Sequence, residues 1–164
     1  MPNPYFQFKQ FTIWHDKCAM KVGTDGVLLG AWAEAGAPQQ ILDIGTGTGL
    51  IALMLAQRNP LSQITAIEID EAAATQAEEN IARSPWANRI EVICNDFSLF
   101  QTDNKYHLIV SNPPYFVDAL NCPDKQRNMA RHTCELNYEL LFQRSAHLLE
   151  DQGRICIIIP TEAE

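Results

Sequence analysis

The chain has 164 residues, of which 46% are hydrophobic and 20% charged, and these proportions are typical of a single globular domain. No apolar run approaches the roughly 20 residues of a membrane helix and the first residues lack the order of a signal peptide, so we expect a cytoplasmic protein that binds no membrane. The net charge of −8 argues against a broadly basic surface for nucleic acid, because phosphate contacts made by Lys and Arg usually supply most of that affinity.

Short β-branched runs alternate with longer helical patterns from residue 40 onward, which predicts an α/β fold with helices on both faces of a parallel sheet. Ahead of this region, Thr24 is the expected N-cap of a helix that runs toward Gly36. Gly153 is expected to break the chain before the last strand. The predicted strands are 41–44, 64–68, 90–94, 106–111 and 154–159, and the predicted helices between them are 50–58, 71–83 and 135–150.

The five cysteines stand singly, without a C-x-x-C pair, so we expect neither disulfides nor a structural zinc site. We therefore predict that the chain holds no metal. Cys122, His132 and Cys134 are the nearest to a set of ligands, but their spacing fits no zinc pattern.

The segment 43–49, Asp-Ile-Gly-Thr-Gly-Thr-Gly, joins the first predicted strand to a helix. A loop there must turn sharply and let a ligand approach its backbone, and glycine meets both demands. The G-x-G-x-G spacing differs from the dinucleotide fingerprint G-x-G-x-x-G. Asp43 would repel a pyrophosphate but can pair with an ammonium group, and Glu68, which ends the next strand, can accept hydrogen bonds from both hydroxyls of a ribose. The expected ligand is a nucleoside with a cationic tail.

This loop and its acidic partner resemble the first two motifs of the class I S-adenosylmethionine-dependent methyltransferases. The resemblance implies that S-adenosylmethionine is the cofactor, that Gly45 and Gly47 approach it, and that Glu68 holds its ribose. It also implies that Asp43 lies beside the methionine end.

Three acidic positions leave alternatives open. Asp70 competes with Glu68 for the ribose, because strand alternation puts both side chains on one face; we prefer Glu68, since Asp70 suits the cap of the following helix. The resemblance implies that Asp96 reaches the adenine amino group, with Phe97 packing nearby. Asp43 can instead cap its turn, and Asp96 can be an ordinary loop carboxylate.

The tetrapeptide Asn-Pro-Pro-Tyr follows the fourth predicted strand, at the edge of the sheet where such folds bind ligands. An amino group conjugated to a ring or a carbonyl is a poor nucleophile until two acceptors on its N–H groups localise the lone pair. Asn112 and the carbonyl of Pro113 can be those acceptors, and the consecutive prolines keep them in place. We therefore predict that a planar amino nitrogen is methylated without a metal or a nucleophilic residue. The residues expected to act in the reaction are Asn112, Pro113 and Tyr115, those expected to contact the target are Pro114, Tyr115 and Phe116, and Asn112 is also expected at the cofactor.

Basic residues occur on both sides of this motif in the sequence. Those before it are Lys9, Lys17 and Lys21, and those after it are Lys125, Arg127 and Arg131. We predict that the second group contacts the substrate, although ordinary solvated charges would have the same pattern.

The segment 11–32 narrows the choice of substrate. Asn-Pro-Pro-Tyr occurs in adenine N6-methyltransferases of DNA or RNA, in glutamine methyltransferases of release factors and in guanine N2-methyltransferases of ribosomal RNA. Within this segment, Val-Gly-Thr-Asp followed by Leu-Leu-Gly-Ala-Trp resembles the bacterial enzymes that methylate N6 of adenosine 37 in valine tRNA. The likeness covers nearly the whole chain and implies that the partner is a tRNA anticodon loop. Thr24 would then line the methionine end of the cofactor.

We expect one methyltransferase domain over residues 1–164, with a lead-in of about 1–38 ahead of the first strand. The family continues after the fifth strand with a helix and two closing antiparallel strands, so we expect a truncated sheet with an open apolar edge. One alternative is a glutamine methyltransferase, but the residues before the first strand are too few for its peptide-binding domain. A second alternative is a cofactor-binding fragment without catalysis.

Overall fold

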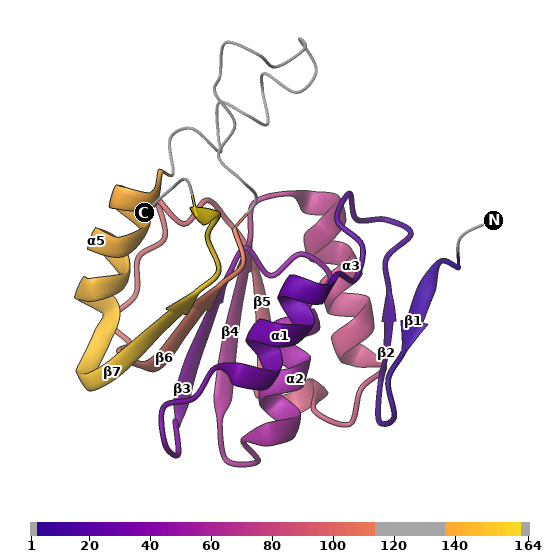
Figure 1. The fold of residues 1–164 in the computed structure, drawn as a ribbon, viewed down its shortest axis with the longest axis horizontal. Coiled ribbons are helices and arrows are strands. Elements are labelled where there is room, and N and C mark those ends of the chain that lie inside the picture. The colour runs from indigo at the N-terminus through magenta and orange to yellow at the C-terminus, as the bar shows by residue number, and fades with distance from the viewer. Residues whose placement is uncertain (1–2, 114–136, 162–164) are drawn as a thin grey trace, which may run out of the picture.

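The computed structural model describes residues 3–113 and 137–161, and they form a five-stranded parallel sheet in the order β5-β4-β3-β6-β7 beside a two-stranded hairpin (Figure 1). The neighbours β3 and β6 are not consecutive in the chain, so the strand order reverses between them, and sheets of this kind bind ligands at such a point. The strands of the sheet are β3 (Gln40–Ile44), β4 (Gln63–Glu68), β5 (Ile90–Cys94), β6 (Tyr106–Ser111) and β7 (Leu149–Ile157).

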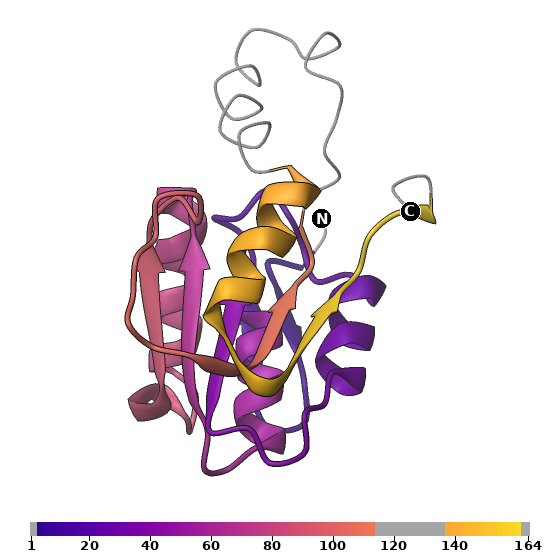
Figure 2. The ribbon, with the colours of Figure 1, turned by 90° about the vertical axis from the view of Figure 1, so that its left-hand side faces the viewer.

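Helices cover both faces of the sheet, as the sequence predicts. Successive residues of β3 point to opposite faces, so Ile41 joins one hydrophobic core with α1 and α2, while Leu42 joins a second core with Leu141 of α5. Figure 2 shows α5 in front of the sheet. The helices are α1 (Thr24–Trp32), α2 (Leu50–Arg58), α3 (Glu71–Ala82) and α5 (Tyr138–Leu148), with a 3-10 turn at Ala87–Arg89.

The predicted bounds and the observed ones agree closely for the strands β3 to β6 and for the helices α2 and α3. The strands 90–94 and 106–111 and the helix 50–58 have the predicted bounds, and β3, β4 and α3 differ from prediction by one residue at one end. α5 begins at Tyr138 rather than at 135, and residues 135 and 136 lie outside the described part of the chain.

The start of the last strand was predicted wrongly. β7 begins at Leu149, five positions before the predicted 154, and it contains Gly153 instead of following it. The pairing register of β7 with β6 shifts between Tyr106 and Leu108. A Cβ on Gly153 would lie 3.0 Å from the carbonyl oxygen of Tyr106, so glycine lets the irregular strand approach its neighbour.

The N-terminal region also differs from prediction. Thr24 is the first residue of α1, and Gly23 occupies the N-cap without a side-chain hydrogen bond, so the predicted cap is wrong by one position. α1 ends at Trp32, short of Gly36. An unpredicted antiparallel hairpin precedes it, formed by β1 (Tyr5–Gln7) and β2 (Thr12–Trp14).

α1 packs closely on α2 through two glycines on one face. A Cβ on Gly30 would lie 2.5 Å from the sulfur of Met54, and one on Gly26 would lie 3.0 Å from a methyl carbon of Leu50. Arg58 at the end of α2 donates hydrogen bonds of 2.8 Å to the carbonyl oxygens of Gly30 and Ala33, which satisfies the C-terminus of α1. The N-terminal end of α1 is thereby fixed beside the start of α2.

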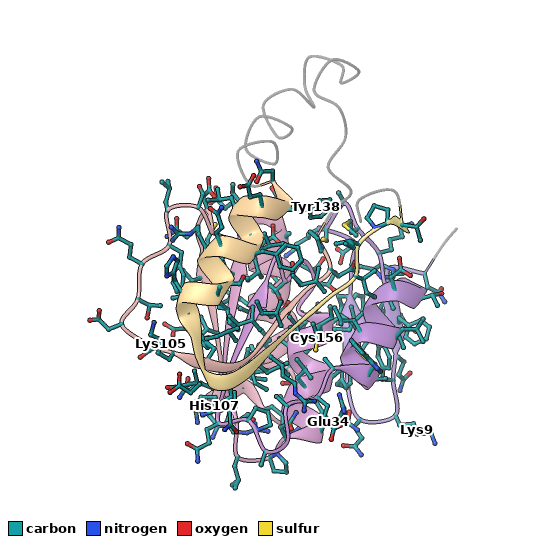
Figure 3. The ribbon with its side chains drawn as sticks, turned by 60° about the vertical axis from the view of Figure 1, so that its left-hand side comes forward. Lys9, Glu34, Lys105, His107, Tyr138 and Cys156 are labelled. Carbon is teal, nitrogen blue, oxygen red and sulfur yellow. The ribbon has the colours of Figure 1, made fainter. Side chains whose placement is uncertain are left out.

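Side chains at the end of the sheet where the strands begin make structural contacts. Figure 3 shows Lys105 and His107 at the end where β6 starts, and there His107 Nδ1 accepts a hydrogen bond of 3.2 Å from the Gln40 amide. Lys105 Nζ donates to the carbonyl oxygen of His147. These contacts stabilise the end of the sheet at which the parallel strands begin. The opposite end, where the strands finish, is the end at which folds of this kind bind ligands.

Candidate functional site

A pocket of about 290 Å³ lies where the chain leaves β3 and β6, at the carboxyl edge of the sheet. One wall, here called the lead-in wall, consists of residues from the segment 20–26, including Thr24. The other, here called the loop wall, consists of residues from the segment 45–51. Asn112 and Pro113 complete the lining. The fold thus brings together the glycine loop, the lead-in and the start of the tetrapeptide, which the sequence separates widely.

The loop wall requires glycine for conformational reasons. Gly45, Gly47 and Gly49 have φ values of +71°, +58° and +86°, in the left-handed region that disfavours other residues. The amides of Gly45 and Thr46 both donate to the carbonyl oxygen of Ile67, at 2.8 and 2.9 Å. These contacts hold the loop against the end of β4.

The carboxylates of Glu68 and Asp70 accept hydrogen bonds from different parts of the chain. Glu68 accepts a 2.7 Å hydrogen bond from the Gly47 amide and a 3.1 Å bond from the Asp70 amide, and burial raises the pKa of its carboxyl group. Asp70 accepts a 3.1 Å bond from the Ala73 amide and so caps α3, which confirms the cap predicted for it. Glu68 is therefore the carboxylate that touches the glycine loop, although it does not line the pocket.

Asp43 is fully buried behind the loop wall. One carboxylate oxygen accepts a 2.7 Å hydrogen bond from the Thr46 hydroxyl, so Asp43 does stabilise its turn. Burial raises its pKa to about 7. The other oxygen has no hydrogen-bond partner among the described residues, and a Cβ on Gly45 would meet nothing within 4 Å. Asp43 therefore lies outside the pocket lining and supports the loop wall from behind.

Asp96 and Phe97 lie after β5, outside the pocket lining. Asp96 accepts 2.8 Å hydrogen bonds from the amide and the hydroxyl of Ser98, so it stabilises the turn. Phe97 is buried, with its ring 6.5 Å from that of Phe100 and 5.5 Å from the guanidinium carbon of Arg144. The Phe97 ring thus belongs to the core on the α5 side.

Asn112 and Pro113 follow directly from β6. Asn112 is partly buried and Pro113 is buried. The end of β6 is joined to that of β3 by Ser111, whose hydroxyl donates to the carbonyl oxygen of Ile44 at 2.8 Å. A Cβ on Gly26 would lie 3.7 Å from the Asn112 amide nitrogen, so the amide lies next to the first turn of α1. The other predicted target and substrate contacts, Pro114, Tyr115, Phe116, Lys125, Arg127 and Arg131, lie outside the described residues.

Two polar residues of α3 that were not predicted to have a role, Gln76 and Asn80, are each 1% exposed. Asn80 contacts Trp14 and Thr48, and Gln76 contacts Lys17. The helical spacing of the sequence indicated that these two residues are buried, because they share one face of α3 with alanines that are buried too. The sequence alone, however, does not tell what such a face packs against.

Within the described ranges, no three His, Cys, Asp or Glu side chains lie close enough to hold a metal ion. Cys122, His132 and Cys134 fall outside these ranges. None of the described helices is long and apolar enough to cross a bilayer.

Solved structures share this fold. A putative O-methyltransferase from Nostoc punctiforme has a TM-score of 0.62 and 22% identity, covering 81% of this chain and 36% of its own. An S-adenosylmethionine-dependent methyltransferase from Thiobacillus denitrificans, solved with S-adenosyl-L-homocysteine, has a TM-score of 0.59 and 20% identity, covering 83% and 48%. At these identities the likeness confirms the class I methyltransferase fold.

Sequence relatives identify the family. The methyltransferase small domain family matches residues 20–164. A tRNA1(Val) (adenine(37)-N6)-methyltransferase from Bacteroides thetaiotaomicron is 65% identical over 163 residues, which are 99% of this chain and 69% of the relative. A protein of the same name from Erwinia tasmaniensis is 52% identical over 162 residues, 96% of this chain and 66% of that one. This chain therefore belongs to the methyltransferase small domain family and, within it, to the tRNA1(Val) (adenine(37)-N6)-methyltransferases.

Proposed function

We infer that the chain is an S-adenosylmethionine-dependent methyltransferase that methylates N6 of adenosine 37 in valine tRNA. The observation that carries this inference is the shared pocket, in which a glycine loop suited to the methyl donor faces Asn112 and Pro113, which are suited to an amino acceptor. The 65% identity to an enzyme of this name supports tRNA adenine as the acceptor, in preference to a glutamine side chain or guanine.

The cofactor contacts are proposals for individual residues. S-adenosylmethionine, when bound, supplies a methyl group on a positively charged sulfur. Gly45 and Gly47 let it approach the backbone, and Thr24 lies across the pocket from them. Glu68 already accepts two amide hydrogen bonds, and its oxygens keep further lone pairs for the ribose hydroxyls. We assign Asp43 to the methionine ammonium group by its place near the end of β3, directly before the glycine loop.

We assign the adenine end of the cofactor to the loop of Asp96 and Phe97, because this loop follows β5. Asp96 uses one carboxylate oxygen for Ser98, which leaves the other for an amino group. Phe97 lies in the core, so its ring holds the loop in place instead of stacking on the ligand.

The target amino group would donate one hydrogen bond to the Asn112 side-chain oxygen and one to the Pro113 carbonyl. These two acceptors would localise the nitrogen lone pair, which would form a bond to the methyl carbon as the carbon–sulfur bond breaks and its electron pair stays on sulfur. Because both groups are fixed at the end of β6, little rearrangement is needed as charge develops on the nitrogen. The proton would be lost afterwards to water, with Asp118, which lies outside the described residues, as the weaker alternative.

The remaining contacts concern the tRNA. We assign stacking of the flipped adenine to Tyr115, with Pro114 and Phe116 beside it, and phosphate contacts to Lys125, Arg127 and Arg131. A substrate of this kind supports the cytoplasm as the compartment. We also propose that residues 1–164 act as one methyltransferase domain.

The test is methyl transfer from labelled S-adenosylmethionine to unmodified valine tRNA. We expect label in that tRNA and none when adenosine 37 is replaced by guanosine, which lacks the N6 amino group. Label that appears only in protein substrates would reject the proposal in favour of the glutamine alternative. Cofactor binding without transfer to any RNA would instead favour a non-catalytic fragment.

A further inference from the structure

Two buried amide side chains of α3 contact the chain near the pocket. Gln76 and Asn80 are each 1% exposed, although the exposed face of the same helix is mostly polar. Burying an amide costs free energy unless its donors and acceptors are satisfied. The hydrogen-bond partners of Gln76 and Asn80 therefore explain why polar residues occupy the buried face of α3.

Asn80 uses its whole side-chain amide. Its oxygen accepts a 2.9 Å hydrogen bond from the Trp14 amide, and its nitrogen donates 2.9 Å to the Trp14 carbonyl and 2.8 Å to the Thr48 carbonyl. Trp14 ends β2, and Thr48 belongs to the loop wall of the pocket. One side chain thus joins the N-terminal hairpin to the glycine loop.

The segment 15–22, here called the strap, connects this joint to the lead-in wall. Gln76 accepts a 2.7 Å hydrogen bond from the Lys17 amide, and the buried His15 accepts one of 3.4 Å through Nδ1 from the Val22 amide. The strap then supplies Met20 and Lys21 to the pocket. The position of the lead-in wall therefore depends on contacts with α3.

We propose that Asn80 is a positioning residue that holds the lead-in wall and the loop wall at the spacing the cofactor requires. This inference rests on the proposed function in taking S-adenosylmethionine as the ligand of the pocket. Asn80 does not line the pocket, so it acts through the backbones of Trp14 and Thr48. Without it Trp14, from which the strap begins, and Thr48 lose these bonds, and cofactor binding must then order both walls at a cost in affinity.

An amide suits this position better than its close relatives. The site needs one acceptor and two donors on the same small group, which asparagine provides. Aspartate would keep the acceptor for Trp14 but would direct a carboxylate toward two carbonyl oxygens. Alanine would leave three backbone groups without this partner.

The test is calorimetric titration of S-adenosyl-L-homocysteine into the unsubstituted chain and into Asn80→Ala. We expect the dissociation constant to rise about tenfold with unchanged stoichiometry, the effect expected from losing one or two buried hydrogen bonds. A purely structural role would unfold a fraction of the molecules, which lowers the stoichiometry and leaves the dissociation constant unchanged. That result would overturn the proposal.

Glu79→Gln is the matched control on the same helix. It removes only the exposed ion pair with Lys17, whose side chain is 46% exposed, and should leave the affinity within about twofold. A tenfold loss in this control would contradict a specific role for Asn80.

A second variant keeps the proposal testable if Asn80→Ala does not fold. Gln76→Met keeps the length of the side chain but removes the acceptor for Lys17, so affinity should fall about threefold with full stoichiometry. Unchanged affinity in Gln76→Met would mean that the lead-in wall does not depend on contacts of the strap with α3, and it would overturn the proposal. If the unsubstituted chain itself does not bind, the proposed function fails and the role of Asn80 fails with it, a result distinct from loss in the variants alone.

Discussion

The loop wall of the pocket is held by residues near it in the chain, whereas the lead-in wall is held by residues far away. Thr46 bonds to Asp43, three positions earlier, and Gly47 bonds to Glu68, 21 positions later. Trp14 and Lys17 bond to Asn80 and Gln76, at separations of 66 and 59 positions. Most contacts of the first wall therefore come from β3 and β4, although Asn80 also bonds to Thr48, and those of the second come mainly from α3, farther along the chain.

Substitutions in the two walls should therefore have different effects. A change in the loop wall alters the backbone that faces the ligand. A change behind the lead-in wall alters only how firmly that wall is held. Asn112, at the junction of the two walls, should affect the chemistry more than either.

The largest effect is expected for Asn112→Ala. Loss of one preorganised acceptor should lower the transfer rate about 10²–10³-fold, while the dissociation constant for the cofactor changes less than about threefold. Single-turnover transfer and calorimetry measure the two quantities. Equal loss of both would mean that Asn112 holds the walls together instead of acting on the amino group.

A smaller effect is expected for Gly47→Ala, paired with Gly23→Ala as control. Gly47 has φ +58°, so alanine should lower the free energy of unfolding by about 1–2 kcal/mol, although its Cβ would meet only the Cys18 sulfur at 3.9 Å. Gly23, in the lead-in wall, has φ −126° and accepts alanine without strain. Urea denaturation measures both. Equal losses would show that backbone conformation does not distinguish the walls.

The smallest effect concerns pH and Asp43, behind the loop wall. Its pKa is raised from 3.8 to about 7 by burial, so the folded protein keeps a proton that the unfolded chain releases. This stabilisation is fully present below the unfolded pKa and is lost as pH rises through about 7. Between about pH 6 and about pH 8, Asp43→Asn should therefore gain on the order of 1 kcal/mol relative to the unsubstituted chain.

Denaturation curves of both proteins across that range measure the difference. A constant difference would contradict the raised pKa. Asp103→Asn offers a matched control for the substitution itself, because Asp103 is exposed in a loop.

Much of the fold could be predicted because its signals are local. The strands 90–94 and 106–111 and the helix 50–58 have their predicted bounds, since each is a mostly apolar run with a clear pattern of its own. The start of β7 could not be predicted, because the contact of Gly153 with Tyr106 depends on a register that the sheet decides. The hairpin of β1 and β2 was missed because three-residue strands give almost no periodic signal.

The glycine loop, the acceptor tetrapeptide and the family can be recognised from the residues alone, because each depends on residue types at fixed spacing along the chain. The tertiary structure decided what closes the pocket. Only the folded chain brings Asn80 to Trp14 and Thr48, and Gly26 to Asn112. A buried amide acquires its role from partners distant in sequence, and no local pattern of residues specifies which partners those are.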